Sequence, residues 1–318
     1  MEVRVYKESN RNTDKLITLS LFKMKHAYRN FSIYVRATQN VIQILHELYP
    51  AFNIRIYTDA TTLDDEHFKV LNTDDPQLEI HVYSYPPMLK DEYHEGTFGT
   101  IMRIYPMFLK DDYRIVWSSD VDLPRGHFED MKPYVDSFCR NKRDLLVYQY
   151  FHYDKPYSSA DHEINIVMGI FLSKIKFPTH MFTDFLEDLE HGKYATIVDK
   201  LNENRQSKSY PPTQFPYGTD ELFLNMVLYD NIIDRKWTLI KDYNLDKKMK
   251  SLYYHGNKNA ELIQHTKLST SYFNDRTPQL FKQLKKVYVA IAKKYELTEF
   301  TEHVPEFVDT FWVEFKNG

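Results

Sequence analysis

The chain has 318 residues, with 41 lysine and arginine residues against 45 aspartate and glutamate residues, so its formal charge is −4 at pH 7. This length accommodates one large domain or two ordinary ones, and we favour one. Without a basic excess, the composition indicates neither a nucleic-acid footprint nor a polybasic membrane patch, and we expect no nucleic-acid partner.

The N-terminal segment and the single cysteine bear on location. Residues 1–15 are polar and lack the apolar core of a signal peptide, and no run approaches the roughly 20 apolar residues that span a bilayer. Cys139 can form neither an internal disulfide nor a cysteine-built zinc site, which fits a reducing compartment. We therefore predict a cytoplasmic protein without a transmembrane segment.

Apolar periodicity predicts strands that alternate with helices in the first 120 residues. Strands are predicted over 15–22, 53–59, 78–85 and 113–120, and helices over 31–49 and 99–108. Such alternation is typical of a mostly parallel sheet with helical crossovers. Ligands of such sheets bind at the carboxyl ends of the strands.

The rest of the chain continues the alternation and contains one long polar segment. Strands are predicted over 143–151, 164–174 and 237–244, and helices over 181–193, 219–231 and 277–297. Residues 199–218 are polar and contain three prolines, so we predict a loop there. Long loops in compact domains often cover or line binding sites.

Two carboxylates separated by one residue follow the strand predicted over 113–120. In an extended chain Asp120 and Asp122 face the same side, where they repel unless a cation or proton lies between them. Oxygen ligands favour Mg²⁺ or Mn²⁺, which keep positions open for diphosphate oxygens. Acidic pairs also occur in solvated surface turns, but here an apolar run leads into the pair and Pro124 ends it. We therefore predict a divalent cation site.

A second acidic pair, Asp220 and Glu221, lies where a loop enters a helix. Gly218 and Thr219 open that helix, and its free N–H groups and dipole favour negative charge. On its own, the pair is explained by helix capping. The alternative is that one acid caps the helix while its neighbour faces a substrate.

Basic side chains are candidates for the same edge of the sheet. His255 precedes Gly256 and Lys258; an imidazole can complete a Mn²⁺ site, and a lysine can meet phosphate as a point charge. Arg103, on the helix before the acidic strand, could reach the same strand ends. Taken singly, each is more often an ordinary surface side chain.

Together these motifs resemble the GT-A fold glycosyltransferases, most closely the family-8 retaining, metal-dependent enzymes. Asp120 and Asp122 match the family's D-x-D motif, and the segment from Asp220 to Asn225 matches D-Q-x-x-x-N with Glu221 in place of glutamine. Three further motifs match in part: Arg103 to Pro106 is one residue shorter than R-x-x-x-P, 167–169 lacks the asparagine of N-A-G-V/M, and His255 to Lys258 is a compressed H-x-x-G-x-x-K.

The resemblance spans residues 15–258 and implies an α/β protein of GT-A fold, with a mixed, mostly parallel sheet flanked by helices. It implies a catalytic domain over 1–260 and a helical C-terminal extension over 261–318 packed on the same domain. The implied reaction transfers a hexose from a nucleotide-diphosphate sugar, most often a UDP-sugar, to a hydroxyl of an unidentified acceptor, a glycan or a protein. Retention of configuration is implied by the family alone.

The resemblance also implies roles for the site residues. Asp120, Asp122 and His255 would hold Mn²⁺ or Mg²⁺, and Arg103 and Lys258 would stabilise the leaving phosphate. Asp220 and Glu221 would be catalytic: the first holds sugar hydroxyls, and the second lies near the anomeric carbon, where a carboxylate stabilises or traps an oxocarbenium ion. Further donor contacts are expected from Leu19, Ser20, Phe22, Ser119, Asp120, Val121 and Gly169.

Two alternatives stay open. A sugar nucleotidyltransferase shares the alternating architecture and the metal carboxylates, but normally has a glycine-rich loop after its first strand, and residues 18–40 contain no glycine. A degenerate glycosyltransferase would bind sugars or partners without turnover. The intact aspartates at 120, 122 and 220 argue against such decay.

Overall fold

The computed structural model describes most of the chain up to residue 233 and two short strands beyond it. The described residues are 1–24, 30–71, 73–90, 93–94, 96–147, 166, 168–203, 212–233, 237–239 and 260–262. His255, Lys258 and the helix predicted over 277–297 lie outside these residues. The predicted division at residue 260 therefore stays a prediction.

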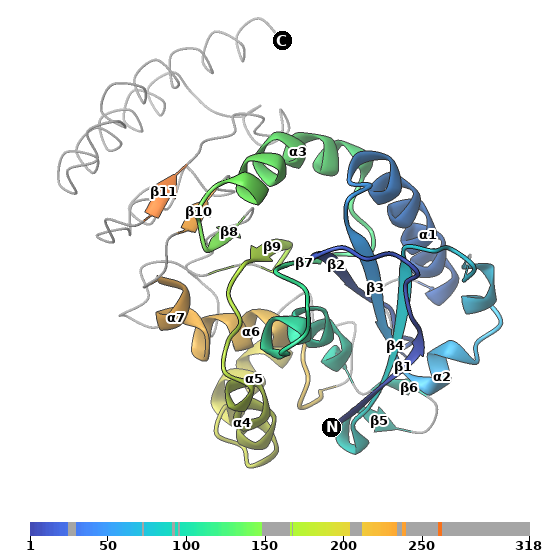
Figure 1. Cartoon of the computed structure of the whole chain (residues 1–318). Coiled ribbons are helices and arrows are strands. Elements are labelled where there is room, and N and C mark those ends of the chain that lie inside the picture. Colours follow the sequence, from blue (N-terminus) through green and yellow to red (C-terminus); the bar gives the residue numbers. More distant parts are fainter. Residues whose placement is uncertain are drawn as a thin grey trace, which may run out of the picture.

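A mixed sheet of nine strands forms the centre of the described part of the chain (Figure 1). The strand order is β1-β4-β3-β2-β7-β9-β8-β10-β11. Strands β4, β3, β2 and β7 are parallel to one another, whereas β1 and β9 run antiparallel to their neighbours. The predicted α/β class, with a mostly parallel sheet flanked by helices, is confirmed.

The strands of this sheet are β1 (Glu2–Lys7), β2 (Lys15–Ser20), β3 (Asn53–Thr58), β4 (Leu78–Ser84), β7 (Ile115–Ser119), β8 (Leu145–Val147), β9 (Ile170–Ser173), β10 (Trp237–Leu239) and β11 (Ala260–Leu262). A separate pair is formed by β5 (Leu89–Lys90) and β6 (Tyr93–His94). The α-helices are α1 (Phe31–Leu48), α2 (Ala60–Leu63), α3 (Arg125–Arg140), α4 (Thr179–Glu190), α5 (Ala195–Glu203), α6 (Thr219–Met226) and α7 (Tyr229–Ile233). Three segments are 3-10 helices: η1 (Phe68–Val70), η2 (Pro86–Met88) and η3 (Phe98–Phe108).

Several elements differ from the sequence prediction. Strand β1 and helix α3 were not predicted, and the segment from 99 to 108 is a 3-10 helix that contains Pro106. The loop predicted over 199–218 is wrong at its start, because α5 continues to Glu203. Strand β1 alternates only at Val3 and Val5, and it exposes most of its side chains because it lies at the edge of the sheet.

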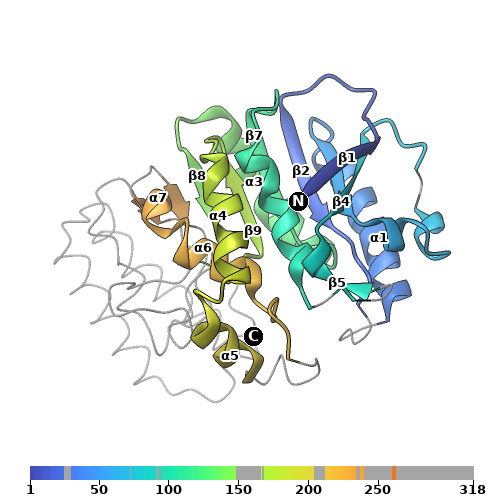
Figure 2. The ribbon, with the colours of Figure 1, turned by 90° about the horizontal axis from the view of Figure 1, so that it is seen from below.

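Helices cover both faces of the sheet (Figure 1), and Figure 2 shows α4, α5 and α6 at one side of the molecule and α1, β1 and β4 at the other. The side-chain alternation of β2 serves both layers. Ile17 and Leu19 belong to the apolar cluster that includes Leu45 of α1 and Val135 of α3. Thr18 points to the opposite face, where its hydroxyl donates to the carbonyl of Arg103 in η3.

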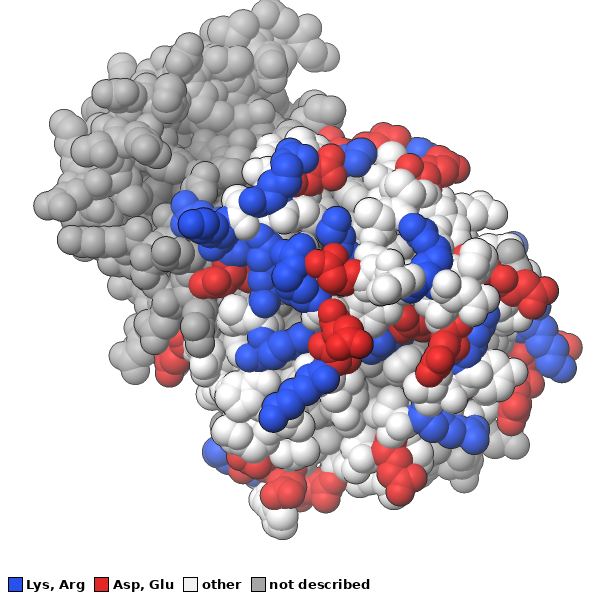
Figure 3. Space-filling view, viewed as in Figure 1, with Lys and Arg blue, Asp and Glu red and all other residues white. Residues whose placement is uncertain are grey.

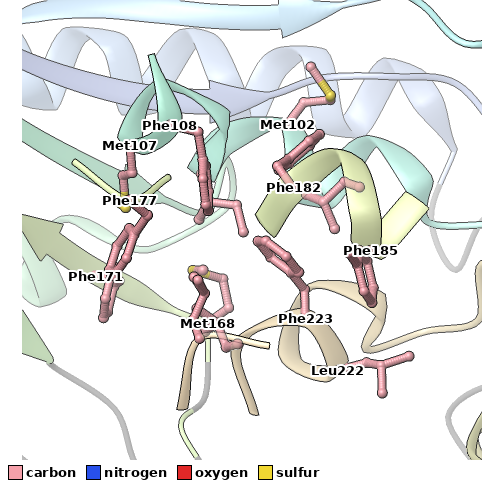
Figure 4. Close-up of a cluster of buried hydrophobic side chains, with 14 of the residues drawn as sticks. Met102, Met107, Phe108, Met168, Phe171, Phe177, Phe182, Phe185, Leu222 and Phe223 are labelled. Atoms are coloured by element: carbon pink, nitrogen blue, oxygen red, sulfur yellow. The ribbon is translucent and has the colours of Figure 1, made fainter. Parts of the chain in front are cut away.

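Aromatic side chains fasten α6 to η3 and α4 (Figure 4). The ring centroid of Phe223 in α6 lies 4.7 Å from that of Phe185, 5.6 Å from that of Phe182 and 5.5 Å from that of Phe108. Such pairs stabilise a fold by about 0.5–1.5 kcal/mol each beyond the area they bury. Because the first turn of α6 carries both acids of the second acidic pair, this cluster fixes where those acids lie.

Both signs of charge mix on the face shown in Figure 3. Strand register brings Lys15, Arg114 and Lys174 to one edge of the sheet, at the amino ends of β2 and β7 and the carboxyl end of the antiparallel β9. Arg114 is paired there with Asp14 at 2.7 Å. No helix in the described part of the chain is long and apolar enough to cross a membrane.

A buried charge network lies on the η3 side of β3 and β4. Arg55 Nε donates to Glu79 at 2.6 Å, and Glu79 also accepts the hydroxyl of Tyr113. His81 Nε2 lies 3.7 Å from the Glu79 carboxylate. Burial and the nearby Arg55 charge nevertheless lower the pKa of His81 to about 3, so His81 is neutral in the folded protein.

The lowered pKa of His81 predicts a loss of stability in mild acid. The unfolded chain binds a proton near the ordinary histidine pKa of about 6.5, whereas the folded chain binds it only near pH 3, so the free energy of unfolding falls as the pH drops between these values. At pH 5 the loss is about 2 kcal/mol. Urea denaturation at pH 7 and pH 5 should show a smaller loss for His81→Gln than for the wild type. Equal losses in both proteins would contradict the assignment.

Candidate active site

Asp120 and Asp122 follow β7 but are not part of it. The strand ends at Ser119, residues 121–122 form a turn, and Pro124 is the N-cap residue of α3. The predicted extended geometry of this pair is therefore wrong, because a turn rather than a strand sets the directions of the two side chains. The two carboxylates are still close enough for the Asp122 charge to act on Asp120.

Arg103 is the cation that holds the acidic cluster together. From η3, its Nη1 donates to Asp120, and its Nη2 donates to Asp220 at 2.6 Å and to the carbonyl of Met168 at 2.7 Å. The planar guanidinium suits such multiple charge-assisted contacts. It thereby joins three elements that are far apart in the sequence: η3, the turn after β7 and the first turn of α6.

The end of β2 fixes the position of η3 and thus of Arg103. The Thr18 hydroxyl anchors the backbone of Arg103 itself. At the start of η3, Gly99 packs against the ring of Phe22, where an added Cβ would lie 2.2 Å from a ring carbon. Only glycine allows so close an approach of backbone and ring.

The electrostatics of Asp120 reflect this crowding. Burial raises the pKa of Asp120 to about 6; the charges of Asp220 and Asp122 raise it too, while Arg103 opposes them. The Asp120 side chain keeps 32 % of its surface exposed, so the carboxylate that Arg103 holds is also open to solvent. Arg103 thus binds the carboxylates of Asp120 and Asp220, and the charge of Asp122 also acts on Asp120.

The donor set of this cluster suits a hard divalent ion. Mg²⁺ is commonly held by one or two carboxylates together with water and substrate phosphates. Among the described residues, no group of three or more histidine, cysteine, aspartate or glutamate side chains is arranged to hold a metal. Of the three predicted ligands, Asp120 and Asp122 lie in the described part of the chain and His255 does not. The metal site stays a prediction.

Asp220 and Glu221 have different surroundings. Asp220 is buried: Oδ1 accepts the N–H of Glu221 at 2.9 Å, and Oδ2 accepts from Arg103. Glu221 is partly exposed, and a Cβ placed on Gly218 would lie 3.8 Å from one of its carboxylate oxygens. Gly218, with φ of +93°, is the N-cap residue of α6. The geometry therefore separates a buried acid from a more accessible neighbour, and the contact of either with a substrate stays a prediction.

Asn225, the last residue of the D-Q-x-x-x-N match, ties α6 to the segment before β9. Its side chain accepts the N–H of Ile166 at 2.6 Å and donates to the carbonyl of Ile166 at 2.7 Å. It is completely buried. By holding Ile166, Asn225 helps to place Met168, whose carbonyl receives Arg103, and the buried Gly169 that follows.

A buried network at the end of β3 holds the segment after β2. The Asp59 carboxylate lies 2.9 Å from His94 Nε2, and both side chains are completely buried. Burial alone would raise the pKa of Asp59, but the hydrogen bond and charge of His94 outweigh it and keep the pKa below its ordinary range. His94 in turn stacks on Phe22 at 4.6 Å and donates its backbone N–H to the carbonyl of Lys23. Phe22 is therefore fixed from two sides, by His94 and by Gly99.

The predicted donor contacts at the sheet edge differ in accessibility. Leu19 is completely buried in the core, so its side chain offers no surface. Ser20 is nearly buried, and its hydroxyl has no hydrogen-bond partner among the described residues, whereas Phe22 is partly exposed. Ser119 is buried and Val121 is partly exposed. These contacts stay predictions, as does that of Lys258, which lies outside the described residues.

Tyr217 is a residue of this cluster that the sequence prediction missed. It is 44 % exposed and directly precedes Gly218. The pKa of Tyr217 is raised by partial burial and further by the carboxylates of Glu221, Asp220 and Asp120. The sequence did contain a signal for Tyr217, since it is an aromatic residue directly before the glycine that precedes the second acidic pair.

No protein-family model and no curated protein matches the chain. Among solved structures, the chain is distantly similar to glycosyltransferases. The galactosyltransferase LgtC, in complex with donor and acceptor sugar analogs, is 12 % identical, with 67 % of this chain and 70 % of that chain covered and a TM-score of 0.38.

Two other solved structures show comparably low sequence identity and TM-score. The glycosyltransferase GlyE of Streptococcus pneumoniae TIGR4 is 10 % identical, with 91 % of this chain and 64 % of that chain covered and a TM-score of 0.33. A proposed glucose-1-phosphate thymidylyltransferase from Bacillus anthracis, in complex with a sucrose, is 15 % identical, with coverages of 54 % and 74 % and a TM-score of 0.32.

Removal of Arg103 should destabilise the protein strongly. Arg103→Leu leaves Asp120 and Asp220 crowded without their cation, and loss of one partner of a buried ion pair costs about 3–5 kcal/mol. Adding Asp220→Asn should recover part of this loss, because one of the unpaired charges disappears.

Urea denaturation of the two single variants and the double variant measures the coupling. Arg114→Leu is the control, since its exposed pair with Asp14 should contribute no more than about 1 kcal/mol. If the losses in free energy of unfolding caused by Arg103→Leu and Asp220→Asn simply add in the double variant, the pairing of the two residues is contradicted.

Proposed function

We propose that this protein is a metal-dependent glycosyltransferase of the GT-A type that transfers a hexose from a nucleotide-diphosphate sugar to an acceptor hydroxyl. The donor is proposed to be a UDP-sugar, and the acceptor a glycan or a protein. One observation carries the proposal: Arg103 joins Asp120 and Asp220, so acids that are 100 positions apart form one cluster. The cluster follows the carboxyl end of β7, where sheets of this kind bind their ligands.

Asp120 and Asp122 are the proposed ligands of Mn²⁺ or Mg²⁺. Their oxygen donors and the effect of the Asp122 charge on Asp120 support this assignment. The ion supplies neutralisation of the charge that develops on the leaving diphosphate. His255 and Lys258, which lie outside the described residues, are proposed from the motif resemblance as a third ligand and a phosphate contact.

Arg103 contributes through its charge and through the carboxylates it holds. Both of its Nη atoms already donate to protein acceptors, and its buried Nε has no partner among the described residues. Its positive charge lies beside the proposed ion ligand Asp120 and favours negative charge on a nearby phosphate. In this role Arg103 positions Asp120 and Asp220 rather than extending into solvent to meet the donor.

Glu221 is the proposed residue next to the anomeric carbon. Its carboxylate is partly exposed beside Gly218, while the buried Asp220 binds the backbone N–H of Glu221 and so fixes the first turn of α6. A carboxylate there stabilises the positive charge of an oxocarbenium-like transition state. Asp220 is proposed to orient sugar hydroxyls, and the Ser20 and Phe22 end of β2 to meet the nucleoside.

Asp122→Ala tests the metal-dependent transfer. Hydrolysis of or transfer from a UDP-hexose in the presence of Mn²⁺ should be abolished, while the urea midpoint stays close to that of the wild type because Asp122 is exposed. The measurement is the release of UDP with and without the cation. Unchanged turnover in Asp122→Ala would end the metal proposal. Release of pyrophosphate from a nucleoside triphosphate and a sugar 1-phosphate would instead indicate a nucleotidyltransferase.

Glu221→Gln tests the role of the second acid. The amide keeps the size and hydrogen-bonding reach of the side chain but removes its charge, so kcat should fall by more than about tenfold, or 1.4 kcal/mol, with a smaller effect on the donor KM. Initial rates at saturating donor give the answer. A fall of less than tenfold would mean that Glu221 has no direct chemical role.

The stereochemistry of the product tests the proposed retention. Proton NMR of the transfer product, recorded early in the reaction, should show the same anomeric configuration as the donor sugar. The coupling constant at the anomeric position distinguishes the two outcomes. Inversion would rule out a retaining mechanism while leaving the cation proposal untouched.

A further inference from the structure

A groove with a volume of about 660 Å³ opens between η2, α5 and the segment that leads to α6. This volume lies within the range of about 300–1,000 Å³ that is typical of ligand sites. Its lining combines apolar side chains with a carboxylate and amides, among them Pro87, Val198, Asp199, Asn202, Pro212 and Gln214.

The groove lies on the same side of the sheet as the acidic cluster. Pro87 follows the carboxyl end of β4, which is parallel to β3, β2 and β7. Leu201 of α5 is buried, and its side chain lies 3.8 Å from the position of a Cβ on Gly218, whereas Asp199 and Asn202 line the groove. Helix α5 therefore lines the groove with Asp199 and Asn202 and lies against Gly218, at the start of α6, through Leu201.

The walls of the groove are fixed by hydrogen bonds. Asn202 donates to the carbonyl of Thr213 at 2.9 Å and accepts the N–H of Thr213 at 3.2 Å. Gln214 Nε2 donates to the carbonyl of Pro87 at 3.3 Å, which links the segment before α6 to η2. The same segment is bound further on, where the carbonyl of Phe215 accepts the backbone N–H of Thr97 at 2.7 Å. The groove is thus preformed, and the segment that forms one of its walls continues into α6, which carries Asp220.

The lining indicates the chemistry of the ligand. Pro87, Pro212 and Val198 offer flat aliphatic surface, and the exposed Asp199 carboxylate has no partner among the described residues. A sugar ring matches this combination, since it has an apolar C–H face and a rim of hydroxyl donors. No lysine or arginine is among the described residues of the lining, so the groove does not favour a phosphate.

We propose that this groove binds distal sugar residues of the acceptor, so that the protein acts on an oligosaccharide rather than on a single sugar. The inference rests on the proposed glycosyltransferase function and adds the class of acceptor to it. A chain that enters the groove passes α5 and presents its terminal hydroxyl near Glu221. The Asp199 carboxylate accepts hydrogen bonds from hydroxyls of a distal ring.

Matched variants of the full chain test the groove. Ala195→Trp places a large side chain in the groove from an exposed position, and Thr196→Trp places the same side chain on the neighbouring exposed position, which does not line it. Asp199→Ala removes the carboxylate, with Lys200→Ala as its neighbour control. Thermal denaturation of all four variants checks their folding.

The probes are fluorescently labelled glycans of one to four residues, built from glucose, galactose or N-acetylglucosamine. With UDP-hexose and Mn²⁺, transfer to the longer probes should exceed transfer to the monosaccharides. The ratio of transfer to donor hydrolysis should fall at least about tenfold in Ala195→Trp and about threefold to tenfold in Asp199→Ala, but not in the two controls. Saturation-transfer NMR with the same probes and no donor measures binding without catalysis.

Each outcome decides the matter. Loss of glycan binding in Ala195→Trp but not in Thr196→Trp supports the groove as a glycan site. Equal binding and transfer in all variants, or no advantage of longer probes over monosaccharides, overturns it. If no donor is turned over while glycan binding still depends on Ala195 and Asp199, the proposed transferase function fails and the groove stands as a glycan site.

Discussion

The arrangement of the acidic cluster depends on the guanidinium of Arg103. Asp120 comes from the turn after β7 and Asp220 from helix α6, and the sheet brings the two together. Their like charges would repel each other there without a cation. The protein supplies its own counter-charge from η3 and uses both Nη atoms to bind the two carboxylates. Buried charged contacts are strong only where their polar groups are hydrogen-bonded. Nearly all of the polar groups in these contacts of Arg103 are hydrogen-bonded.

This pairing divides the four acids into two groups. Asp120 and Asp220 are held by Arg103, whereas the exposed Asp122 and the partly exposed Glu221 lie within two positions of them in the sequence. The acids that Arg103 binds thereby fix the backbone that carries the other two. The aromatic cluster around Phe223 and the amide of Asn225 do the same for α6. A site whose outer groups are positioned in this way is well suited to chemistry that needs fixed charges.

The central strands were predictable from the sequence because they are short apolar runs between turn residues, and α1 because its apolar residues recur at helical spacing. Helix α3 was missed, although its buried residues also recur at that spacing: packing on the sheet overrides the interior Pro133. The site was predicted as separate motifs. Their pairing through Arg103, the turn at Asp122 and the place of Tyr217 depend on tertiary geometry that local patterns do not contain.

The three-way contact of Arg103 has a consequence for sequence variation. Since one guanidinium serves two carboxylates, replacing any of the three residues leaves the others with unmatched charge or an unmatched donor. Positions 103, 120 and 220 therefore form a single unit under selection. In homologous chains of the same architecture, they should co-vary as a triplet, even where the overall identity has fallen too low to align the surrounding loops.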